Sequence, residues 1–107
     1  MKFIGGSIFA IHREYELQNQ QHFHAHIQVK PTGNLEFEIL ESHEHHDTDF
    51  NHLYFEAEKG KTKVLGRDES GQQADWQLLL AEEDAKELNH LVLLVSEQYE
   101  TLMRDLM

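Results

Sequence analysis

The sequence predicts an α+β fold, with an antiparallel sheet of five or six strands in meander-like order and one long C-terminal helix packed on its inner face. Alternating extended segments fill the first three quarters of the chain, and helical spacing of apolar residues fills the last quarter. A hairpin turn signal joins two of the extended segments. The length of 107 residues, without an internal repeat, indicates a single domain, 1–107.

The C-terminal helix is predicted from residues 81–107, where apolar side chains recur three and four positions apart. Acidic residues 82–84 stand at its start, where the positive helix end favours them. Because helical stability comes mostly from burying such a stripe, the helix must lie against an apolar surface. The stripe consists of Ala85, Leu88, Val92, Val95, Tyr99, Leu102 and Leu106.

Three leucines make part of this helix apolar nearly all round. Leu91 widens the stripe, whereas Leu93 and Leu94 point away from it. One interpretation is a second contact, most simply a two-fold dimer with these leucines in its interface. The alternative is that Leu93 and Leu94 lie under a loop or are tolerated singly at the surface.

The first strands are predicted from alternation. Residues 3–17 form one extended segment, and residues 22–30 form a cleaner one, with Ala25 and Ile27 on one face and three histidines on the other. Pro31-Thr32-Gly33 predicts a type I turn followed by a left-handed glycine, leading into a strand over 35–39. This loop pairs Lys30 with Asn34, Ile27 with Phe37, and His26 with Glu38, so that apolar residues face each other.

The second half contains weaker signals. Residues 41–49 include no apolar residue and are predicted to be a connection. Residues 50–58 form the next strand, with Leu53, Phe55 and Ala57 facing inward. A short strand over 62–65, a loop over 66–73 and a last strand over 74–80 precede the helix, with Trp76 facing inward.

Composition narrows the classes of function. A formal net charge of −11 argues against binding nucleic acid, which requires clustered lysine and arginine. The absence of cysteine excludes disulfides and thiolate metal sites. No apolar run is long enough to span a membrane, and the short N-terminal run leads into charged residues without a cleavage signal. These features fit a cytoplasmic protein.

Three histidines lie on one face of the predicted second strand. His24 and His26, two residues apart, are placed to share a zinc ion with Glu38 across the hairpin. The alternative is that a solvent-facing strand carries histidine simply as a polar residue. A third interpretation is a pH-responsive face, because imidazoles charge near pH 6.5. The loop histidines at 43, 45 and 46 form a weaker metal candidate.

No sequence pattern for catalysis is present: there is no phosphate loop, nucleophile elbow or metalloprotease helix. We therefore expect a small acidic, non-enzymatic interaction protein that acts as a homodimer and binds a protein partner. The alternative is a zinc- or other transition-metal-dependent binding protein or hydrolase using residues 22–26. Apart from this zinc, no cofactor is indicated. A small apolar ligand between sheet and helix is a third option.

Overall fold

The computed structural model describes residues 10–19, 21–67, 70 and 74–105, with 98–105 described by their backbone alone. Within these residues, seven antiparallel strands are followed by one helix, which confirms the predicted α+β class. The strands form two sheets, of four and three strands, and each strand within a sheet pairs with the next along the chain. Predicted strand positions before Ala10, and Leu106, lie outside the described residues.

The first sheet contains β1 (Ile11–Glu16), β2 (His24–Lys30), β3 (Asn34–Ile39) and β4 (Glu44–Asp49), in that order. Burial alternates strictly along β2 and β3, so one face of each strand lies in the core and the other faces outward.

The turn between β2 and β3 confirms the predicted register. Gly33 has a φ of 95° and donates its N–H to the Lys30 carbonyl oxygen at 3.0 Å. Lys30 pairs with Asn34 and Ile27 with Phe37, as the length of the loop requires. The apolar residues of both strands therefore share one face.

Strand β4 corrects the prediction that residues 41–49 form only a connection. Residues 44–49 pair with β3, which sets Glu44 opposite Ile39, His46 opposite Phe37, and Thr48 opposite Leu35. Three polar side chains thus occupy positions that face the inner side of the sheet. Because β4 is an edge strand, it can carry polar side chains at these positions, and the apolar alternation that reveals a strand is missing.

The second sheet follows a 3-10 helix at Phe50–His52 and contains β5 (Leu53–Glu58), β6 (Lys61–Arg67) and β7 (Ala74–Ala81). Strand β6 is longer than the predicted strand over 62–65 and includes Gly66, which corrects the prediction of a loop at this position. Ala57 lies on the same face of β5 as Leu53 and Phe55, opposite the buried Thr62, but it is exposed because it lies near the end of the β5–β6 hairpin.

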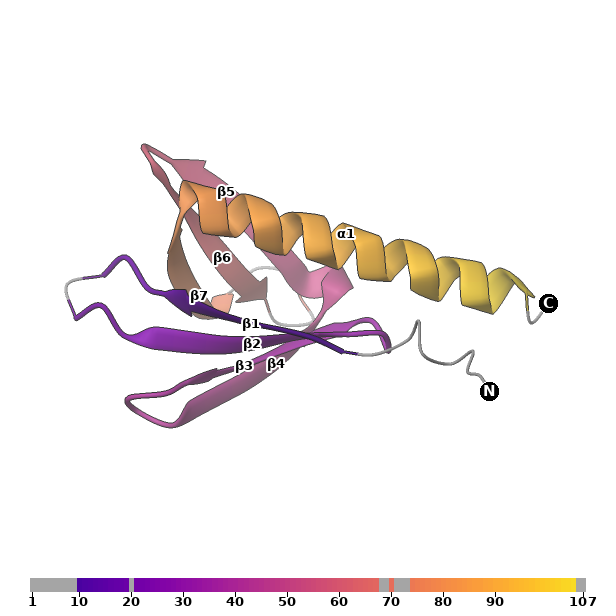
Figure 1. Ribbon diagram of the computed structural model, residues 1–107, viewed down its shortest axis with the longest axis horizontal. Helices are drawn as coiled ribbons and strands as arrows, with labels where there is room; N and C mark the ends of the chain where they lie inside the picture. The colour runs from indigo at the N-terminus through magenta and orange to yellow at the C-terminus, as the bar shows by residue number, and fades with distance from the viewer. Residues whose placement is uncertain (1–9, 20, 68–69, 71–73, 106–107) are drawn as a thin grey trace.

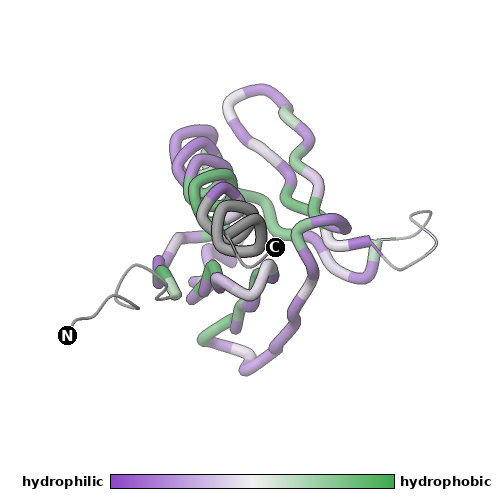
Figure 2. Tube along the Cα trace, turned by 90° about the vertical axis from the view of Figure 1, so that its right-hand side faces the viewer, coloured by the Kyte–Doolittle hydropathy of each residue, from purple (hydrophilic) through white to green (hydrophobic). Residues whose placement is uncertain are grey.

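The helix α1 (Glu82–Asp105) lies across both sheets and contacts β2, β5, β6 and β7 (Figure 1). Viewed nearly along the helix, the β5–β6 hairpin stands beside it (Figure 2). The predicted stripe is buried at Ala85, Leu88, Val92 and Val95. Just after β1, the backbone N–H of Gln18 donates to the carbonyl oxygen of Leu79 at 2.8 Å, and this hydrogen bond joins the first sheet to β7.

The core lies between the two sheets and the helix. Its best-buried side chains come from all three layers and contact one another as a single cluster. The largest side chains that are fully buried are Phe37, Ile27, Leu35, Leu80, Leu88, Val29 and Val64.

Candidate functional site

The structure places the three predicted metal ligands on the outer face of the first sheet, but each has a different partner. His24 donates through Nδ1 to Glu41 at 2.5 Å, and one ring nitrogen of His26 lies 3.1 Å from a ring nitrogen of His12. The carboxylate of Glu38 lies 3.4 Å from Nδ1 of His43. In the described part of the chain, no three His, Asp or Glu side chains are grouped to hold a metal ion.

The outer face of the first sheet instead carries several separate pairs of histidine and carboxylate side chains. The hydrogen bond to Glu41 raises the pKa of His24, and the same bond lowers the pKa of Glu41. A hydrogen bond from Lys30, aided by His45, lowers the pKa of Glu36. The side chains of His24 and Glu41 are 43% and 34% exposed, so this pair contributes little to stability. These pairs place basic side chains beside the carboxylates of the outer face.

The three leucines proposed for an interface lie in three different settings. Leu91 is 8% exposed and belongs to the core, whereas Leu93 and Leu94 are 57% and 39% exposed. Leu93 lies one turn after Asn89, which borders a concave site between α1 and β5. Leu94 lies two turns after Glu87, which bonds to Tyr15 of β1. The exposed leucines therefore flank the outer face of the helix on opposite sides.

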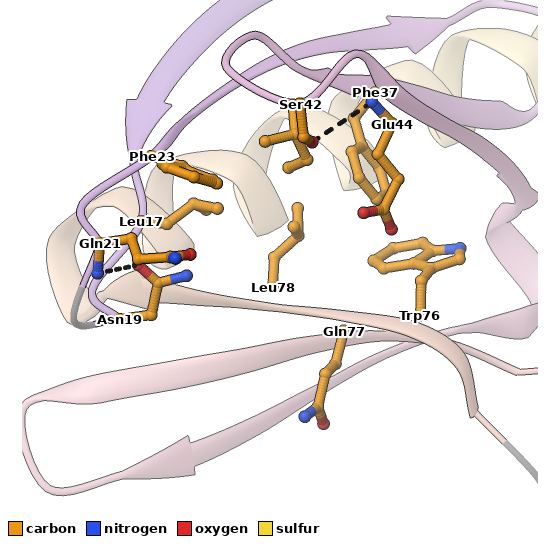
Figure 3. Close-up of a pocket in the computed structure, with 11 residues that line it drawn as sticks. Leu17, Asn19, Gln21, Phe23, Phe37, Ser42, Glu44, Trp76, Gln77 and Leu78 are labelled. Atoms are coloured by element: carbon orange, nitrogen blue, oxygen red, sulfur yellow. Dashed lines mark hydrogen bonds between the residues drawn. The ribbon is translucent and has the colours of Figure 1, made fainter.

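A cavity of about 240 Å³ opens between the two sheets (Figure 3). Its walls are formed by six apolar side chains, which come from both sheets and from the β1–β2 connection. Five polar residues also border it, and among these only Glu44 is charged. The apolar wall residues are Leu17, Phe23, Phe37, Ile39, Trp76 and Leu78. The bordering polar residues are Asn19, Gln21, Ser42, Glu44 and Gln77.

One wall of this cavity is held rigidly by an aromatic cluster. The rings of Phe37 and Trp76 meet edge to face with centroids 4.6 Å apart, and the ring of His46 lies 5.3 Å from Phe37. Trp76 donates its Nε1–H to Thr48 at 2.7 Å, which fixes the indole against β4. His46 also donates to Glu44 at 2.8 Å, so the carboxylate is held beside this wall.

The sequence does not predict this cavity. Trp76 and Phe37 are nearly completely buried, in agreement with their assignment to the core, and the alternation of β3 and β7 gives no sign of a gap between them. The available signal was the polar character of Glu44 and His46. Both face the inner side of the sheet once residues 44–49 are recognised as a strand.

A second concave site lies between β5 and α1. Phe55 and Ala57 of β5 form one wall, and Ala85, Lys86 and Asn89 of α1 contribute to the other. Its volume is about 290 Å³. Strand β5 is the outermost strand of its sheet, since within the described residues it pairs only with β6. This site, the groove between β5 and α1, therefore adjoins a sheet edge.

No helix in the described part of the chain is both long enough and apolar enough to cross a membrane. Comparisons of the chain with protein-family models, with curated proteins and with solved structures found no match. The two concave sites and the exposed helix face are therefore the features of the molecule that bear on its function.

Proposed function

We propose that this chain is a small, non-enzymatic protein-binding domain that receives an extended segment of a partner along β5. The observation that carries the proposal is the position of the groove between β5 and α1 beside an outermost strand. A segment added to such an edge forms backbone hydrogen bonds, and its alternate side chains enter the adjacent groove.

The groove favours a partner segment that carries both apolar and basic side chains. Phe55, Ala57 and Ala85 supply apolar surface that an inserted aliphatic side chain can cover. The charged groups around it are Glu58, Glu82 and Lys86, and the lysine is paired with Glu82 at 3.3 Å. The balance around the groove is therefore acidic, like the chain as a whole at −11. A basic segment is attracted by this field.

The proposal is tested by selecting binders from a random-peptide display library with the whole chain. Selected peptides are then measured against two variants that add the same charge at exposed alanines, A57R in the groove and A74R at the start of β7. We expect the peptides to lose about tenfold or more in affinity for A57R because arginine fills the groove, and to bind A74R like the parent. Failure to enrich peptides, or equal loss in both variants, contradicts the proposal.

A two-fold dimer through the outer face of α1 is a second candidate, favoured by the exposure of Leu93 and Leu94. It predicts that the parent sediments as a dimer and that the double variant L93Q/L94Q sediments as a folded monomer. L40Q is the matched control, because Leu40 is similarly exposed at 38% but lies in the β3–β4 turn. A monomeric parent at about 100 μM, a concentration at which an interface of ordinary affinity is occupied, excludes the dimer.

A further inference from the structure

The cavity between the two sheets has the features of a ligand site that is separate from the groove between β5 and α1. It combines apolar walls with a few polar groups, which is the usual composition of a small-molecule pocket. We propose that it binds a small apolar ammonium compound, with the ammonium group at Glu44 and the apolar body between Phe23 and the Phe37–Trp76 wall.

The size of the cavity limits the ligand to about one ring. Its volume of about 240 Å³ lies below the usual range for drug-sized molecules, which begins at about 300 Å³. Figure 3 shows Phe23 and Leu17 on one side and Trp76 and Phe37 on the other, with Leu78 between them. A single aromatic ring or short branched chain covers these side chains without displacing them.

The charge of the ligand follows from Glu44. Among the described residues that border the cavity, Glu44 alone is charged, and its side chain is 59% exposed, so a ligand can reach the carboxylate. Its bond to His46 occupies one of roughly four acceptor positions on the carboxylate and leaves room for an ammonium group. The nearby aromatic rings also attract a cation.

These features disfavour the neutral and anionic relatives of the same ligand. The neutral polar groups Ser42, Asn19 and Gln21 can hydrogen-bond an alcohol, but they do not offset the loss of the contact with Glu44. A carboxylate ligand would lie beside Glu44 in a chain that already carries −11. The expected order of affinity is therefore amine, then alcohol, then carboxylate.

Trp76 is the only tryptophan of the chain and lines the cavity, so its fluorescence reports occupancy directly. The whole chain is titrated with phenethylamine, 2-phenylethanol and 3-phenylpropionate, and amide NMR shifts locate each ligand. We expect saturable binding of the amine, about fivefold tighter than the alcohol, as suits one exposed charge pair. The shifts should map to Leu17, Phe23 and Leu78.

Two substitutions of glutamate separate a specific contact from general attraction. E44Q should remove the preference for amine over alcohol, whereas E14Q, with the same change in net charge on the outer face of β1, should leave it intact. Q21E adds a second carboxylate beside the cavity and should strengthen amine binding. The proposal is overturned if binding does not saturate, if amine and alcohol bind equally, or if the shifts lie outside the cavity.

Discussion

Gly66 is the position where a single added methyl group should most strongly disturb the packing of the two sheets. A Cβ built there lies 2.3 Å from both Cε2 and Nε1 of Trp76, far inside van der Waals contact. The indole cannot move aside freely, because it bonds to Thr48 and packs against Phe37. In G66A, the ring must therefore shift, and β6 must shift with it.

The cost of G66A can be assembled from its parts. Overpacking costs roughly 1–3 kcal/mol, and loss of the bond from Trp76 to Thr48 costs about 1 kcal/mol more. Replacing glycine returns about 0.4–1 kcal/mol by reducing the freedom of the unfolded chain. The net loss is about 2 kcal/mol, which lowers the melting temperature of a domain of this size by roughly 10 °C.

The assay is urea unfolding followed by the fluorescence of Trp76, whose folded-state emission should also change in G66A. The matched control is G33A, where nothing lies within 4 Å of the added Cβ and the cost arises only from the positive φ. W76L should relieve the clash, so the two substitutions should be clearly non-additive in the double variant. G66A that keeps parental stability and parental emission would refute the close contact between Gly66 and Trp76.

Two further predictions concern hydrogen bonds of β1 and β2. Tyr15 donates to Glu87 at 2.6 Å, and burial together with this bond raises the pKa of Tyr15 far above its usual 10. Y15F should cost about 1 kcal/mol in urea unfolding, and the alkaline difference absorbance should lose the tyrosine that ionises far above pH 10. The pair of His24 and Glu41 stabilises the fold fully between pH 4.5 and pH 6.5, which are the ordinary pKa values of glutamate and histidine. This stabilisation is lost as the pH rises through the raised pKa of His24. It is also lost as the pH falls through the lowered pKa of Glu41. By NMR, E41Q should lower the pKa of His24 more than E14Q does; equal effects would contradict the assignment of this bond.

The β2–β3 hairpin shows how much of the fold could be predicted from the sequence. Pro31 and Gly33 determine the length and type of the turn, and this length determines which residues face each other. In that register, the apolar residues of one strand lie opposite the apolar residues of the other. Turn chemistry and alternation are both local properties, so neither required knowledge of the rest of the chain. The stripe of α1 was predictable for the same reason.

The division into two sheets was not predictable in this way. It occurs at the 3-10 helix Phe50–His52, which lies between the consecutive strands β4 and β5. The N–H of Phe50 bonds to the Gly33 carbonyl oxygen at 2.9 Å, a contact between residues far apart in sequence. The alternation and turn signals of the sequence involve only neighbouring residues, so they do not predict such a contact. The same limit applies to Gly66, whose neighbour Trp76 could be identified only from the structure.

The histidines of β2 were the most prominent sequence signal, yet the structure directs attention to β4. The alternation of His24 and His26 with buried residues identifies an outward face, where polar side chains need no special explanation. Glu44 and His46 lie opposite Ile39 and Phe37, on the side that a sandwich normally fills with apolar groups. A polar side chain at such a position must either bond to a neighbour or border an opening. Glu44 does both, and this is why the cavity beside it, rather than the histidine face, is the better place to look for a small ligand.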